Sequence, residues 1–113
     1  MNNQNKAFVN SYTGTGNSGC YENAIKISAF GDNQIKFLLE NGPYVYASVN
    51  SLTNASIISM PDYYVDTDGS STAITGGTIT LNGNSLTMTI LFSSYDADED
   101  ESYNASCTSV FSK

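Results

Sequence analysis

The chain has 113 residues, of which 40% are hydrophobic and 13% are charged, and this length suits one domain with a usable core. Four basic and eleven acidic residues give a net charge of −7, which repels nucleic acid, so we expect no nucleic-acid binding. The chain contains no His, which excludes Ser-His-Asp and Cys-His catalysis and zinc sites built on His.

Apolar and polar residues alternate with a period of two through most of the chain, and helical periodicity is absent. The polar opening at residues 1–6 predicts an N-terminal tether, and residues 7–113 predict a single β domain. The predicted strands are Ala7–Tyr12, Cys20–Phe30, Ile35–Leu39, Tyr44–Asn50, Ser56–Met60, Ala73–Leu81, Ser85–Phe92 and Ser102–Phe111.

The connections between these strands are short and rich in turn residues. The glycine-rich segment at residues 14–19 predicts a flexible turn, and Pro61 predicts the end of the fifth strand. Residues 62–72 predict the longest irregular stretch. The Asn82-Gly83-Asn84 turn predicts a strong hairpin between the two strands that flank it.

Consecutive strands without helical crossovers predict an antiparallel meander. About eight strands of this length can close into a small up-and-down β-barrel, which removes the sheet edges. A two-sheet β-sandwich is the alternative, because periodicity does not distinguish the two architectures.

The two cysteines, Cys20 and Cys107, lie near opposite ends of the β domain. In a closed barrel the first and last strands are neighbours, so we predict a Cys20–Cys107 disulfide and an oxidising compartment. The alternative is a cytosolic protein with two buried free thiols.

Several segments together resemble a known group of proteins. They are Tyr12-Thr13-Gly14-Thr15-Gly16, a Cys at the start of the second strand, the 74–89 hairpin and Ala105-Ser106-Cys107-Thr108 before the end. This pattern resembles the small lipocalin-like (calycin-like) lipoproteins of Bacteroidetes-type bacteria. The resemblance implies a barrel that is secreted, periplasmic or attached to the outer membrane or cell surface. It implies membrane attachment only through an N-terminal lipidated Cys, which this sequence lacks, and it implies no reaction.

An acidic run near the end of the chain has the spacing of calcium ligands: Asp96, Asp98, Asp100 and Ser102. The run departs from the EF-hand pattern, because Glu101 replaces the glycine and Cys107 replaces the final Glu. A solvated hairpin tip is the simpler interpretation, and we predict calcium binding that is weak at most, with no other cofactor. Asp62, Asp66 and Asp68-Gly69 form a second, sparser acidic loop, in which Asp-x-Asp-Gly favours a turn with or without a metal ion.

Four tyrosines are the candidate ligand-binding residues: Tyr44, Tyr46, Tyr63 and Tyr64. Alternation sends Val45, Ala47 and Val49 to the core, so Tyr44 and Tyr46 are expected on the outer face of the fourth strand. Tyr63 and Tyr64 are expected in the loop after Pro61. Tyrosine rings stack on sugars and anchor protein interfaces, although exposed strand tyrosines are also ordinary β-formers.

We therefore expect a non-enzymatic, monomeric binding domain whose ligand is a glycan, a small molecule or a partner protein. The alternative is a structural or inhibitory protein–protein interaction module. A small hydrolase with paired carboxylates is disfavoured, because every Asp lies in a predicted loop. A hollow barrel favours a small ligand, and a filled core with an exposed tyrosine or acidic patch favours a protein partner.

Overall fold

The structure is a computed structural model that describes residues 4–18, 24–39 and 42–113. One short 3₁₀ helix precedes nine strands. The elements are η1 (Gln4–Phe8), β1 (Asn10–Ser18), β2 (Ala24–Phe30), β3 (Gln34–Leu38), β4 (Tyr44–Val49), β5 (Asn54–Ile57), β6 (Met60–Val65), β7 (Ser71–Asn82), β8 (Ser85–Asp96) and β9 (Glu101–Ser112).

The strands form one antiparallel sheet that closes on itself. Their order is β5-β4-β3-β2-β1-β9-β8-β7-β6, and an additional pairing joins β5 to β7. Eight strands therefore form a closed barrel, and β6 is an extra strand on β7. This closure confirms the predicted small antiparallel barrel and excludes the alternative, a two-sheet β-sandwich.

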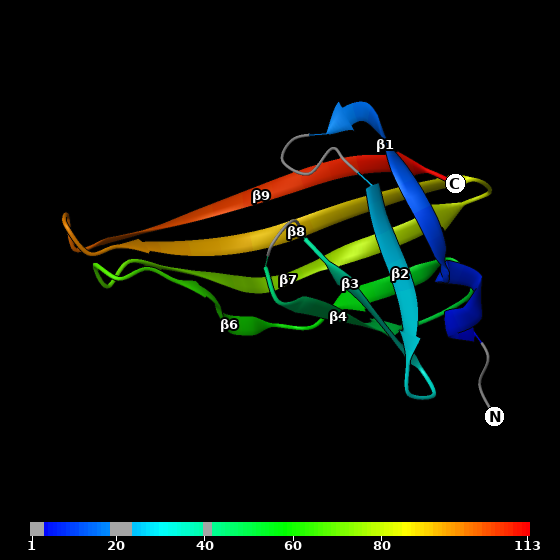
Figure 1. Cartoon of the computed structure of the whole chain (residues 1–113), viewed down its shortest axis with the longest axis horizontal. Coiled ribbons are helices and arrows are strands. Elements are labelled where there is room, and N and C mark those ends of the chain that lie inside the picture. Colours follow the sequence, from blue (N-terminus) through cyan, green and yellow to red (C-terminus); the bar gives the residue numbers. More distant parts are fainter. Residues whose placement is uncertain (1–3, 19–23, 40–41) are drawn as a thin grey trace.

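The long strand β7 changes its partner along its length. Its end at residues 78–80 pairs with β5 and closes the barrel, whereas its start at residues 71–74 pairs with β6. A register shift between Ile74 and Gly76 separates the two parts. Beyond this point β6 and the long strands β7, β8 and β9 run past the barrel as an open sheet, and the molecule measures 46 × 32 × 20 Å (Figure 1).

We call this extension the projecting sheet. It consists of β6 with residues 71–74 of β7, 91–96 of β8 and 101–106 of β9. Two turns, at residues 66–70 and 97–100, form its tip. The helix η1 and the C-terminus lie at the other end of the molecule (Figure 1).

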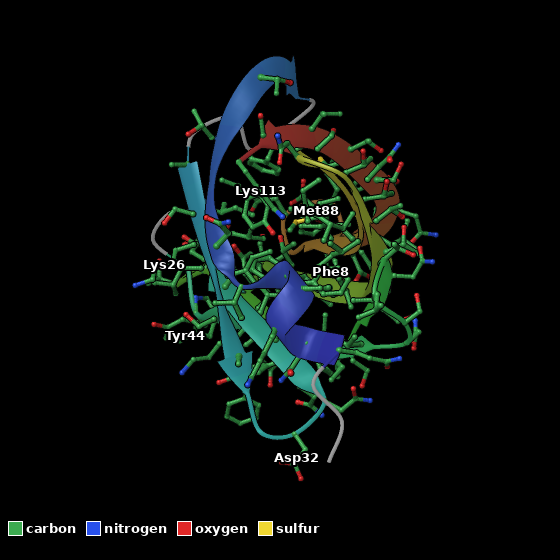
Figure 2. The ribbon with its side chains drawn as sticks, turned by 90° about the vertical axis from the view of Figure 1, so that its right-hand side faces the viewer. Phe8, Lys26, Asp32, Tyr44, Met88 and Lys113 are labelled. Atoms are coloured by element: carbon green, nitrogen blue, oxygen red, sulfur yellow. The ribbon has the colours of Figure 1, made fainter. Side chains whose placement is uncertain are left out.

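The barrel interior is filled by eighteen of the twenty described apolar side chains of the core, as the strand alternation predicts. Phe8, Tyr12, Phe37 and Phe111 are the largest of them, and each has no exposed surface. Phe8 points from η1 into the end of the barrel toward the side that holds Met88 (Figure 2). The Tyr12 hydroxyl donates a 2.8 Å hydrogen bond to the Phe8 carbonyl, which fixes the helix over the opening.

The expected tether is wrong for its described part, residues 4–6. Asn5 is 4% exposed, and its amide donates to the carbonyls of Gly31 and Gln34. These two hydrogen bonds tie η1 to the β2–β3 turn and to the start of β3. The first strand begins at Asn10, not Ala7, because residues 4–8 close the barrel as a helix.

Two further expectations about the elements are wrong. The segment expected as a glycine-rich turn belongs to β1 as far as Ser18, where Gly14 and Ser18 pair with β9. The segment expected as a loop after Pro61 contains β6. Pro61 is tolerated there because β6 is an edge strand, where a missing N–H need not break a ladder bond.

Candidate functional site

Most of the negative charge of the protein is collected on the projecting sheet. Eight of the eleven acidic residues lie on it or in its turns, whereas the four lysines belong to η1, β2, β3 and the C-terminus. The eight are Asp62, Asp66, Asp68, Asp96, Asp98, Glu99, Asp100 and Glu101. The molecule therefore has an acidic end and a lysine-bearing end.

The two acidic turns are far apart in sequence and adjacent in space. The backbone N–H of Ala97 donates a 3.0 Å hydrogen bond to the Ser70 hydroxyl. Within the 66–70 turn, Ser70 N–H donates to the Asp68 carboxylate and Asp66 N–H donates to the Ser70 carbonyl. These bonds fix both turns next to each other, so their carboxylates form one surface.

An open cavity of about 480 Å³ lies at this tip. All four strands of the projecting sheet contribute to its wall. The residues that line it are Tyr64, Asp66, Asp68, Ser70, Ser71, Thr72, Ser94, Tyr95, Asp96, Asp98 and Tyr103. The wall therefore combines aromatic rings, hydroxyl groups and carboxylates, and it contains no positive charge.

Two of the tyrosines hold carboxylates at the tip. The Tyr103 hydroxyl lies 2.8 Å from Oε2 of both Glu99 and Glu101 and can donate to one of them at a time. These hydrogen bonds, that to Glu99 foremost, raise the pKa of Tyr103 to about 12. The Tyr95 hydroxyl donates to Asp100 Oδ1 at 2.7 Å, and this bond raises the pKa of Tyr95. Both phenols stay protonated at neutral pH, and the carboxylates retain lone pairs for an external donor.

The structure does not bring the predicted calcium ligands together. Asp96 Oδ1 accepts from the N–H of Asp98, Asp100 accepts from Tyr95, and Ser102 pairs with Tyr95 in the β8–β9 ladder. Asp100 adopts a left-handed backbone conformation with φ of 54°, which completes a tight turn. Within the described residues, no group of three or more carboxylate or thiol ligands could hold a metal ion.

The four predicted tyrosines lie at two separate places. Tyr44 and Tyr46 are on the outer face of β4, as expected, and Tyr44 points away from the barrel (Figure 2). The Lys36 ammonium lies 4.6 Å from the centre of the Tyr44 ring, and the Tyr46 ring packs on Phe30 with centroids 4.8 Å apart. These contacts form a small aromatic cluster around one lysine on the barrel wall.

Tyr63 and Tyr64 lie on strand β6, so their placement in a loop is wrong. Tyr64 is 56% exposed and lines the cavity at the tip. Tyr63 is half-buried against the core, with its ring centroid 6.4 Å from that of Phe92, so it is not a surface ring. The sequence analysis missed Tyr95 and Tyr103, although both flank the acidic run in the predicted hairpin.

Of the two cysteines of the predicted disulfide, the structure describes Cys107 but not Cys20. Cys107 lies on β9, half-buried and packed against the core. Cys20 lies outside the described residues, so the bond stays a prediction.

Comparison with protein-family models, with curated proteins and with solved structures finds no match to this chain. The resemblance to lipocalin-like lipoproteins therefore gains no support from them and stays a prediction. The described part of the chain contains no helix that is both long and apolar enough to cross a membrane.

Proposed function

We propose that this protein is a non-enzymatic binding domain that recognises a basic partner protein through its projecting sheet. The observation that carries the proposal is the concentration of eight acidic residues on the projecting sheet, where four of them and three tyrosines line an open cavity. Carboxylates accept hydrogen bonds from lysine and arginine, and tyrosine faces attract their charged groups. A surface of one charge also steers an oppositely charged partner toward it.

The barrel itself supports this choice over a small ligand held inside. Its interior is occupied by large side chains, and Phe8 fills the end under η1. The space that a lipocalin-like ligand needs is therefore taken by the core. An open concave surface of about 480 Å³ lies on the projecting sheet instead.

The carboxylates of the tip are also arranged for binding rather than for acid catalysis. Every described carboxylate is at least partly exposed. A general acid that works at neutral pH needs an apolar pocket that raises its pKa. Exposed carboxylates instead suit recognition of a cation.

The experiment measures binding of a lysine-rich peptide, a glutamate-rich peptide of equal length and a neutral oligosaccharide at low salt. We expect the lysine-rich peptide alone to bind, and its affinity to fall as salt screens the charges. A variant with Asp98→Asn, Glu99→Gln and Glu101→Gln should lose at least about tenfold in affinity, equal to about 1.4 kcal/mol. The Asp32→Asn variant, which removes a carboxylate from the β2–β3 turn of the barrel, is the matched control.

Equal binding by the neutralised variant and the control contradicts the proposal. Binding of the oligosaccharide instead would assign the cavity to a glycan, because tyrosine rings next to carboxylates also suit sugar rings.

The Cys20–Cys107 disulfide belongs to the same proposal. Ser18 on β1 pairs with Ser109 on β9. Cys20 comes two residues after Ser18 in the sequence, and Cys107 comes two residues before Ser109, which supports the pairing of the two cysteines. The bond supports an exported location, and the lipid anchor rests on the resemblance alone. A monomer is proposed as well, since the negative charge of the tip disfavours self-association.

A further inference from the structure

Within the described part of the chain, the strand β9 leaves one edge of the projecting sheet open. It pairs with β8 along its whole length, from Glu101 to Ser112. On its other side, among the described residues, β9 pairs with β1 at Ser109, Phe111 and Ser112. Residues 101–106 have no strand on that side within the described part of the chain, and all six are exposed.

Hydrogen bonds elsewhere on β9 show which residues direct their backbone groups to the open edge. The Val110 carbonyl accepts a hydrogen bond from Thr15 Oγ1 on β1. The backbone N–H and C=O of this even-numbered residue therefore point away from β8. The Lys113 N–H donates to the carbonyl of Asn84, which directly precedes β8. The backbone groups of this odd-numbered residue therefore point toward β8. The β8–β9 register is continuous, and the direction of backbone groups alternates along a strand.

Ser102, Asn104 and Ser106 therefore present their N–H and C=O groups to the open edge. Their spacing matches the repeat of an antiparallel or parallel ladder. The backbone N–H and C=O groups of these three alternate residues can form ladder hydrogen bonds with a strand from another chain. Their side chains are small and polar, so none blocks the approach of a second backbone.

The opposite edge of the sheet, strand β6, is protected in a way that β9 is not. β6 carries Pro61 and Asp62, and its pairing with β7 contains a register shift. Proline, charge and irregularity are the devices that prevent strand addition at an edge. Residues 102–106 contain no proline, no charge and no irregularity.

The charge around the open edge decides which strand fits it. Glu99, Asp100 and Glu101 lie at its start, and the cavity at the tip adds further carboxylates. A second copy of this chain would bring another acidic sheet beside the first, which costs electrostatic energy. A strand with lysine or arginine side chains complements the edge.

We propose that an extended basic segment of the partner adds to the β9 edge as a fifth strand of the projecting sheet, with its backbone on Ser102, Asn104 and Ser106. This inference rests on the proposed function and specifies how the basic partner is held. The new ladder fixes the backbone of the segment, and the carboxylates of the tip select its charge.

The first experiment compares two peptides with the intact protein. One is an acetylated heptapeptide of alternating lysine and threonine, and the other is the same peptide N-methylated at every internal residue. Methylation keeps the charges and removes the internal N–H donors of the peptide. We expect the methylated peptide to bind at least tenfold more weakly.

The second experiment changes the protein. Asn104→Pro removes an N–H that faces the open edge and not β8, so the fold should survive it. Asn104→Ala keeps this N–H and is the matched control. We expect Asn104→Pro to reduce the affinity for the unmethylated peptide at least tenfold and Asn104→Ala to leave it unchanged. Circular dichroism and the melting temperature establish that both variants are folded.

The outcomes separate this inference from the proposed function. Equal binding of both peptides, together with loss of binding by the neutralised tip variant, overturns strand addition and leaves the basic partner in place. Binding of neither peptide to the unaltered protein overturns both. If Asn104→Pro does not fold, the methylated peptide alone decides, because it needs no variant.

Discussion

The barrel and the projecting sheet are built from the same long strands and have opposite character. Along β8, Leu86, Met88 and Ile90 are buried in the barrel, whereas Ser94 and Asp96 continue the same face into the projecting sheet and are partly exposed. The apolar face ends at Phe92, whose partner Ile74 on β7 already pairs with Met60 of β6. A single strand thus changes from core to polar surface where its inward residues change from apolar to polar.

This comparison suggests a division of roles. The barrel carries most of the stability, because it holds eighteen of the twenty described apolar side chains of the core. The projecting sheet carries the proposed binding groups, since only Ile74 and Phe92 on it belong to that core. Changes in the barrel should therefore affect stability, and changes in the projecting sheet should affect binding.

The largest expected effect comes from the proposed Cys20–Cys107 bond. Its removal by reduction should lower the free energy of unfolding by roughly 4–5 kcal/mol, because the bond closes most of the chain into one loop. Thermal unfolding with and without reductant measures this. Thiol titration of the denatured, unreduced protein should find no free thiol, and two free thiols would contradict the bond.

The next largest effect is a difference in stability between two substitutions that remove an aromatic ring, one in the barrel and one in the projecting sheet. Phe8→Ala should cost about 3–5 kcal/mol, because the ring fills the end of the barrel and leaves a cavity. Tyr64→Ala in the projecting sheet should cost about 1 kcal/mol or less, since most of that ring is exposed. Urea unfolding of both variants checks this, and equal costs would remove the distinction between the regions.

Two adjacent glycines test the junction between barrel and projecting sheet. At Gly77, with φ of 148°, a Cβ would clash with the Thr89 carbonyl oxygen and would lie 2.9 Å from Ile57 Cδ1. Gly77→Ala should therefore cost about 3 kcal/mol through overpacking. Gly76→Ala is the control, because a Cβ there meets nothing within 4 Å. We expect the control to lose clearly less stability in the same urea titration.

The smallest effect is a pH dependence at the tip. The folded-state pKa of Tyr103 is about 12, above the ordinary value of 10.0. Its hydrogen bonds with Glu99 and Glu101 thus contribute fully below pH 10 and are lost as the pH rises toward 12. Absorbance titration of the phenols should show a late-titrating group that disappears in Tyr103→Phe. Glu99→Gln with Glu101→Gln should return Tyr103 toward its ordinary pKa, and an unchanged titration would refute this account.

The barrel was predictable from the sequence because alternation fixes which side chains share a face. Val45, Ala47 and Val49 are buried as predicted, and the hairpin around Gly83 forms with the expected positive φ of 61°. The helix η1 was not predictable, since its five residues show no helical period and it is held by the buried contacts of Asn5 and Phe8.

The candidate site was less predictable than the fold. The sequence identifies the acidic run, but the approach of the 66–70 turn to it depends on β6, which Pro61 conceals. Phe30 at the end of β2 is 44% exposed beside Tyr46, because the alternation of buried residues does not hold to the end of this strand. The open edge of β9 follows only from the complete strand order.

The central claim is that the projecting sheet binds a basic strand, and amide hydrogen exchange tests it most directly. Exchange is measured residue by residue with and without the alternating lysine and threonine heptapeptide. The account predicts that the peptide slows exchange of the amides of Ser102, Asn104 and Ser106, with no change on the outer wall at Lys36 and Tyr44. Protection confined to that wall, or unchanged exchange along β9 while the peptide is bound, would contradict it.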